Sequence, residues 1–147
     1  PERWPVVMAL LARRPSPEVQ FFCLQLLQDH VRLMTRHQEL RKALMSLVCG
    51  QLADLGPTFL VNRLAALLGD LILLDFPQGW PEAFSELLEL AAKYSAAADL
   101  FLRISLVLND AFDPCHAQKG PAELARDHRV KDAMRASAVP AIVSLLQ

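Results

Sequence analysis

The stretch PTFLVNRLAALLGDLILLDFPQGWPEAFSELLEL, residues 57–90, decides how this chain folds. Its first half, residues 59–76, is apolar on nearly every side, so a helix formed there must be covered on several faces. Its second half shows the i, i+3, i+4, i+7 spacing of a single apolar helix face: Phe84, Leu87, Leu88 and Ala91. The segment FPQGWP between the halves cannot continue a helix, because it contains two prolines and a glycine. The stretch therefore predicts two antiparallel helices, one widely buried and one amphipathic, that need neighbours.

The same order of helices recurs along the rest of the chain. Broadly apolar helices are expected to start near residues 17, 57 and 96, and each is followed by a narrower amphipathic one. The period is about 40 residues, which is typical of HEAT-type repeats whose helix pairs bury their faces by stacking on one another. We therefore predict an all-α, right-handed α-α superhelix, a HEAT/armadillo-like solenoid of about three and a half antiparallel helix pairs. The predicted repeats cover residues 1–14 (a second helix only), 17–55, 57–94 and 96–147.

Two details of this pattern are specific expectations. The amphipathic helix of the first full repeat is expected over about residues 37–55, and the last helix over about 126–146, after a loop at residues 113–124 that contains proline and glycine. Pro140 lies inside the last helix and is expected to kink or split it, because proline removes a backbone donor and clashes with the preceding turn.

Composition and charge narrow the class of protein. The chain has 147 residues, of which 53% are hydrophobic and 21% charged, and its net charge is −1. These values indicate a folded chain and give no overall signal for nucleic acid. No apolar run reaches about 18 residues without a charge, so we expect no membrane insertion. The chain starts without methionine and stops in the middle of a helical pattern, so we expect it to be a segment of a longer protein.

Cysteine and histidine residues give no catalytic or metal-binding pattern. Cys23, Cys49 and Cys115 are odd in number and widely spaced, which favours reduced core thiols of an intracellular protein. Cys115 and His116 lie in a loop far from His128, a spacing that fits neither a zinc site nor a nucleophile pair. His30 is expected to be a hydrogen-bonded core residue. We therefore predict that the chain is not an enzyme, binds no metal and has no small-molecule substrate.

Two groups of charged residues are candidates for binding surfaces. Glu82, Glu86 and Glu89 share the outer face of one helix, which is either a solvated surface or a patch for a basic partner. The densest basic cluster lies on the last helix and is diluted by Asp127 and Asp132: Arg126, Arg129, Lys131 and Arg135. It contains no aromatic residue for base stacking, and both a solvated face and a phosphate-contacting face remain open. Arg41 and Lys42 are a weaker candidate for phosphate contacts.

Five stretches of the chain are distinctive in sequence and order: EVQFFCLQLLQDHV (18–31), FLVNRLAALLGDL (59–71), WPEAF (80–84), DLFLRI (99–104) and VKDAMRASAVPAIV (130–143). Together they resemble the tRNA exportin (exportin-T) family of the importin-beta superfamily. The resemblance extends from about residue 4 to the end and corresponds to the N-terminal HEAT repeats of the family. The chain departs from the family pattern in its loop 113–124, which bears Pro, Gly and Cys, and in helices rich in Ala and Leu.

The resemblance implies a carrier that works between nucleus and cytoplasm. Members of the family bind mature tRNA cooperatively with the small GTPase Ran in its GTP form, shuttle through the nuclear pore in contact with pore proteins, and release cargo on GTP hydrolysis. It also implies no cofactor in this chain, because the GTP is bound by Ran. Ran is engaged largely through inner-surface helices, which here would be residues 37–55, 80–94 and 126–146.

On those helices we expect two sets of contact residues. The residues expected to face Ran are Arg41, Lys42, Ser46, Glu86, Glu89 and Lys93, and those expected to face the RNA backbone are Arg129, Lys131 and Arg135. Two other functions remain open from the sequence. The protein is alternatively an importin-beta-type receptor for protein cargo, or a HEAT-repeat scaffold without GTPase coupling.

Overall fold

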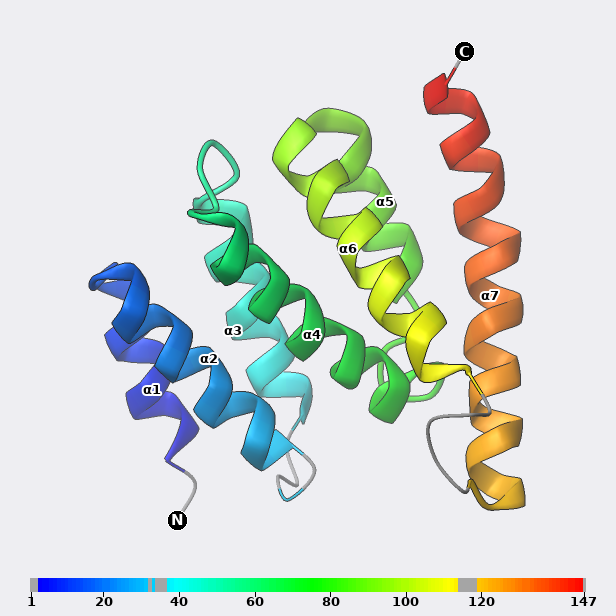
Figure 1. The fold of residues 1–147 in the computed structure, drawn as a ribbon, viewed down its shortest axis with the longest axis horizontal. Coiled ribbons are helices and arrows are strands. Elements are labelled where there is room, and N and C mark those ends of the chain that lie inside the picture. Colours follow the sequence, from blue (N-terminus) through cyan, green and yellow to red (C-terminus); the bar gives the residue numbers. More distant parts are fainter. Residues whose placement is uncertain (1–2, 32, 34–36, 114–118, 147) are drawn as a thin grey trace.

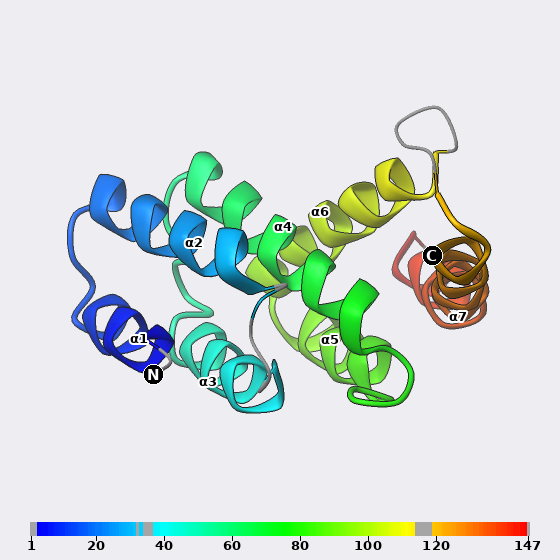
Figure 2. The same ribbon diagram turned by 90° about the horizontal axis from the view of Figure 1, so that it is seen from below.

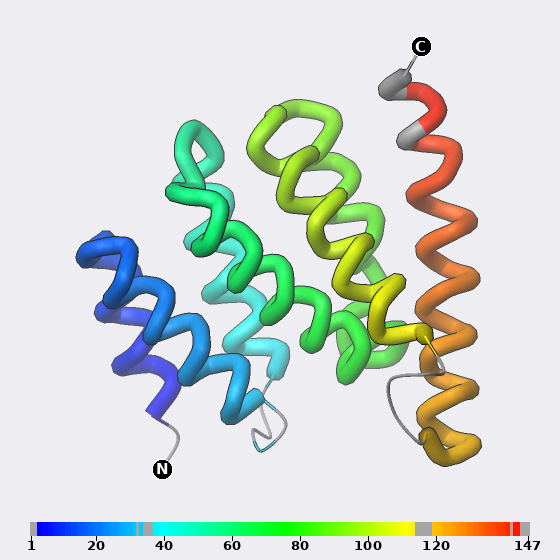
Figure 3. The backbone as a smooth tube through the Cα atoms, in the orientation of Figure 1, coloured from blue at the N-terminus to red at the C-terminus, as the bar shows by residue number. Residues whose placement is uncertain are grey.

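The computed structural model describes residues 3–31, 33, 37–113 and 119–146 of the chain. Within these ranges the regular structure consists of seven helices, and no strand is present (Figure 1). The helices are α1 (Trp4–Ala12), α2 (Pro17–Val31), α3 (His37–Gly50), α4 (Thr58–Asp75), α5 (Ala83–Lys93), α6 (Ser95–Ala111) and α7 (Pro121–Leu146). Consecutive helices from α2 onward run in opposite directions, as the continuous backbone trace shows (Figure 3).

The helices form two layers, which are clearest in the view from below (Figure 2). One layer contains α2, α4 and α6, and α4 packs against both of its neighbours. The other layer contains α1, α3 and α5, and α5 packs tightly on α6 of the first layer. Helix α7 closes one end of the stack against α5, α4 and α6. The predicted all-α solenoid, one lone helix followed by three helix pairs, is confirmed.

The two halves of residues 57–90 behave as their patterns predict. Helix α4 buries apolar side chains on nearly every side, because α2, α3 and α6 all pack around it. Its buried residues are Leu60, Val61, Leu64, Ala65, Leu67, Leu68, Gly69, Leu71, Ile72 and Leu73. Helix α5 buries only one face, which contains Ala83, Phe84, Leu87 and Ala91. The intervening turn carries Trp80, whose side chain is fully buried.

Two helix boundaries differ from the prediction. Helix α3 ends at Gly50 and not near residue 55, and the chain turns there with the amide of Gln51 donating to Val48 O over 3.0 Å. The linker that follows is fixed by Asp54, whose Oδ1 accepts the amide hydrogen bond of Gly56 at 2.9 Å. Gly56 adopts φ 98, a left-handed conformation that a side chain disfavours. The apolar spacing continues through this linker, so the sequence pattern does not show that the helix ends at Gly50.

The last helix also differs from the prediction. It begins at Pro121 and not near Arg126, because proline suits the first turn of a helix and Glu123 follows it there. It then runs through Pro140 as one helix, so the expected split is wrong (Figure 1). Pro140 is exposed. Residues 114–118 of the expected loop lie outside the described residues.

Two expectations about single side chains are wrong. Cys23 is buried as expected, but Cys49 is exposed near the end of α3. His30 is exposed, and its Nδ1 lies 2.9 Å from Leu26 O of its own helix, so it is hydrogen-bonded without being part of the core. Both residues lie beside the apolar faces of their helices, and sequence spacing alone does not separate the edge of such a face from its centre. Cys115 lies outside the described residues. No helix in the described ranges is long and apolar enough to cross a membrane.

Candidate partner-binding surface

The predicted contact residues fall on three helices that are neighbours in the fold. Helices α3 and α5 belong to the same layer, and α7 packs against α5 (Figure 2). On α3 and α5, four of the predicted residues are exposed: Lys42, Ser46, Glu89 and Lys93. Because positively and negatively charged side chains are interspersed there, this surface is suited to a protein partner of mixed charge.

Two of the predicted contact residues, Arg41 and Glu86, belong instead to a bridge between α3 and α5. The guanidinium carbon of Arg41 lies 5.0 Å from the centroid of the Trp80 ring, within the range of a cation–π interaction. The indole Nε1 of Trp80 donates a hydrogen bond of 3.2 Å to Glu86 Oε2. The three side chains therefore form a row, Arg41–Trp80–Glu86, in which the indole links the helices. The cation–π contact joins α3 to the turn that precedes α5.

Trp80 is a structural residue of this surface that the sequence interpretation missed. Its place in the FPQGWP turn suggested a helix break and not a structural anchor. The available signal was the combination of a large aromatic residue with a proline on its C-terminal side and an acidic residue six positions later. That signal is weak, because no sequence spacing connects Trp80 to Arg41 on a different repeat.

His37 holds the beginning of α3 in place. Its Nδ1 lies 3.0 Å from Asp75 Oδ1 at the end of α4, and its Nε2 lies 2.6 Å from Val31 O at the end of α2. One imidazole therefore contacts the ends of α2 and α4, which are two helices of the neighbouring layer. This contact fixes the first turn of α3, and Arg41 and Lys42 follow in the next turn.

The basic cluster on α7 is smaller than its sequence suggests. Asp127 is buried and pairs with Lys119 and, over 3.4 Å, with Arg126 Nη2. Lys119 also donates to Ala111 O at the end of α6, so these contacts anchor the start of α7. Arg129 and Arg135 are exposed and Lys131 is half-buried. These three residues are therefore the lysine and arginine side chains of α7 that lie outside the contacts of Asp127.

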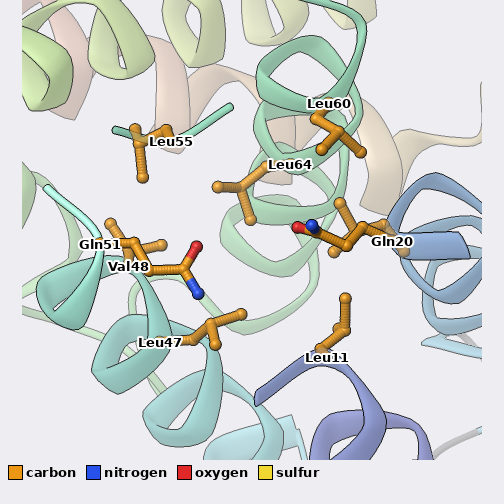
Figure 4. Close-up of a pocket in the computed structure, with 9 residues that line it drawn as sticks. Leu11, Gln20, Leu47, Val48, Gln51, Leu55, Leu60 and Leu64 are labelled. Carbon is orange, nitrogen blue, oxygen red and sulfur yellow. The ribbon is translucent and has the colours of Figure 1, made fainter. Parts of the chain in front are cut away.

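A hollow between α1, α2, α3 and α4 has no chemistry suited to catalysis (Figure 4). Its empty volume is about 350 Å³, and its lining combines apolar side chains with two glutamines: Leu11, Gln20, Leu24, Leu47, Val48, Gln51, Leu55, Leu60 and Leu64. Gln20 Nε2 donates to Pro15 O over 2.7 Å, so this amide is already used. Elsewhere, the described residues contain no group of three or more His, Cys, Asp or Glu side chains placed to hold a metal ion.

Comparison with known proteins gives consistent matches. Residues 57–147 match the family model described as "Exportin 1-like protein". The chain is similar to Exportin-T of Arabidopsis thaliana, with 32% identity over 139 residues, and to Exportin-T of Oryza sativa subsp. japonica, with 34% identity over 138 residues. These alignments cover 85% and 90% of this chain and 14% of each relative. Exportin-T of Homo sapiens is 29% identical over 153 residues, covering 97% of this chain and 16% of the relative.

Proposed function

Because the chain belongs to the exportin 1-like protein family, we propose that it is part of a nuclear export receptor that binds mature tRNA cooperatively with Ran-GTP. The observation that carries this proposal is the similarity along most of the chain to Exportin-T from three organisms. The matched region spans only 14–16% of those relatives, so the activity proposed is that of the longer protein. In this proposal the receptor is a carrier and not an enzyme. It holds no cofactor of its own, since Ran binds the GTP.

The arrangement of charges supports a division of tasks between the helices. The mixed-charge surface of α3 and α5 is the proposed Ran side, which contains Lys42, Ser46, Glu89 and Lys93 with Arg41 and Glu86 at its edge. The exposed or half-exposed basic residues of α7 form the proposed contact with the RNA backbone: Arg129, Lys131 and Arg135. Phosphate contacts position a folded RNA without reading its sequence, which suits a carrier of many tRNAs.

The proposed transport cycle follows from coupling between these two surfaces. If each ligand favours the same curvature of the solenoid, each raises the affinity for the other by the same factor. Release of both ligands in the cytoplasm then follows hydrolysis of the GTP on Ran, and the receptor returns through the nuclear pore by contacts with pore proteins.

A pull-down with the full-length protein tests this proposal. Ran locked in its GTP or GDP state is offered with and without tRNA, and both ligands are quantified. We expect Ran-GTP and tRNA to increase each other's retention, and Ran-GDP to be retained weakly in either case. Ran-GTP binding that tRNA leaves unchanged would favour a receptor for protein cargo. No Ran binding in any condition would leave a HEAT-repeat scaffold.

A further inference from the structure

Arg41 is a buried cation that has no hydrogen-bond acceptor among the residues that the structure describes. Its side chain is 6% exposed, and within the described part of the chain it forms no hydrogen bond and no ion pair. Its Nε is sealed from solvent and unpartnered. The terminal nitrogens are not sealed in this way, so the small exposed fraction of the residue leaves them open to a group from outside. A buried guanidinium normally has its donors satisfied, because removing the charge from water is costly.

The cation–π contact with the indole of Trp80 offsets only part of the free-energy cost of burying the Arg41 charge. The ring lies 5.0 Å from the guanidinium carbon, and Glu86 accepts the indole N–H at 3.2 Å. That hydrogen bond fixes the ring and increases the negative character of its face, which favours a cation above it. The contact therefore orients the guanidinium but uses none of its five N–H donors. Methionine or leucine could fill the same space without burying a charge.

A carboxylate fits these donors best. The planar fork of an arginine matches the two oxygens of a carboxylate, and such a pair is strong when both groups are largely shielded from water. The narrow exposure of Arg41 admits the end of a single acidic side chain more easily than a phosphodiester with its flanking riboses. Arg41 and Trp80 are also the kind of residues that dominate the binding energy of protein interfaces when they lie in a desolvated position.

The surrounding charges favour a protein over an RNA. Glu82 at the N-cap of α5 and Glu86 and Glu89 within it share one face, and Glu86 contacts Trp80, the residue whose ring lies against Arg41. Glu82 and Glu89 are exposed and would repel a polyanion, but they suit the basic side chains of a protein whose surface also carries an acid. Lys42 and Ser46 on α3 extend the same mixed surface.

We propose that Arg41 receives a carboxylate from an acidic side chain of a protein partner that docks across α3 and α5. Trp80 and Glu86 are positioning residues that hold the guanidinium ready for it. The choice of Ran-GTP as that partner rests on the function proposed above. The bound carboxylate would supply the acceptor that Arg41 lacks in the free chain.

The test separates binding from stability by replacing Arg41 with methionine in the full-length protein. Arg41→Met keeps an apolar stem over Trp80 and removes the charge, so the urea midpoint of unfolding should stay the same or rise. The affinity for Ran-GTP, measured by calorimetry, should fall at least about tenfold, because a buried charge pair is lost. Arg41→Lys keeps the charge without the planar fork and should also weaken binding. Arg13→Met, an exposed arginine at the end of α1, is the matched control and should change neither quantity.

Three results would overturn the inference in different ways. Unchanged Ran-GTP affinity in Arg41→Met would show that no carboxylate binds there. A loss of Ran-GTP affinity accompanied by an equal loss of folding stability would show that Arg41 only stabilises the packing between α3 and α5. A wild-type protein that does not bind Ran-GTP would overturn the proposed function and this partner with it.

Discussion

Gly69 on α4 lies so close to Val107 on α6 that a Cβ at position 69 would stand 2.9 Å from Val107 Cγ1. Glycine in a helix interior is unfavourable relative to alanine by about 0.5–1 kcal/mol, so its presence there has to be explained by packing. Here the explanation is the close approach of two neighbouring helices in one layer. The spacing of successive repeats at this point depends on the missing side chain.

Replacing Gly69 with alanine should therefore destabilise the chain despite the better helix propensity. We expect a loss of about 1–3 kcal/mol in the free energy of unfolding, the usual cost of overpacking a core. Urea unfolding followed by circular dichroism measures it. Gly50→Ala is the control, since a Cβ there meets nothing within 4 Å and should cost nothing. A stabilised Gly69→Ala variant would mean that the two helices separate easily.

Arg63 and Arg103 are one repeat apart and both reach back to the preceding helix of their layer. Arg63 Nη1 donates to Gln28 Oε1 over 2.8 Å, while its guanidinium carbon lies 4.8 Å from the centroid of the Phe21 ring. Arg103 Nη1 donates to Asn62 Oδ1 over 2.6 Å and its Nε donates to Asp99 at the surface.

The two arginines should differ in their contribution to stability. Arg63→Ala should cost about 1–3 kcal/mol, because it leaves Gln28 in a half-buried position without its donor and removes the contact with Phe21. Arg103→Ala should cost less than about 1 kcal/mol, since its ion pair with Asp99 is exposed to solvent. Thermal and urea unfolding of both variants measure the difference. Equal costs would contradict the assignment of Arg63 as the more strongly packed link.

Trp80 should be one of the most sensitive positions in the chain. Trp80→Ala removes a fully buried side chain, the ring beneath Arg41 and the donor to Glu86, so we expect a loss of about 3–5 kcal/mol. Tyr94→Ala is a suitable control, because Tyr94 is an exposed aromatic residue at the other end of α5. Urea unfolding compares the two. A Trp80→Ala variant as stable as Tyr94→Ala would show that the turn is not an anchor.

His37 and Asp75 should be energetically coupled. A double-mutant cycle with His37→Ala and Asp75→Ala isolates their interaction, which we expect to be about 1 kcal/mol because their side chains are hydrogen-bonded at 3.0 Å and largely shielded. His37→Ala alone should cost more than that, since it also removes the contact with Val31 O. Additive losses in the free energy of unfolding would show that the two residues act independently.

Cys23 and Cys49 should react at very different rates. Burial raises the pKa of the Cys23 thiol above its ordinary value, because the thiolate is disfavoured away from water. A smaller fraction of Cys23 is thus in the reactive form at any given pH, and the side chain is also covered. In a Cys115→Ser background, Ellman's reagent at pH 8 should modify Cys49 rapidly and Cys23 only after urea is added. Rapid modification of both thiols in the folded chain would contradict the packing of α2.

Much of the fold follows from local patterns that the sequence displays directly. The uninterrupted apolar surface of residues 59–76 requires a helix covered on several sides, and the period of about 40 residues requires stacked pairs. The break at FPQGWP follows from proline and glycine chemistry. The boundaries at Gly50 and Pro121 did not follow, because apolar spacing continues past the first and polar residues surround the second.

Some features of the candidate surface likewise follow from the sequence, and others do not. The sequence by itself determined which helices are amphipathic, and therefore that Lys42, Ser46, Glu89 and Lys93 face outward. Only the tertiary structure decided that Arg41 is buried against Trp80 and that Arg63 is hydrogen-bonded to Gln28. The physical reason is that helix periodicity is a local property, since residues three or four apart share a face. Contacts between repeats join residues about 40 positions apart, and their pairing depends on how the helices stack.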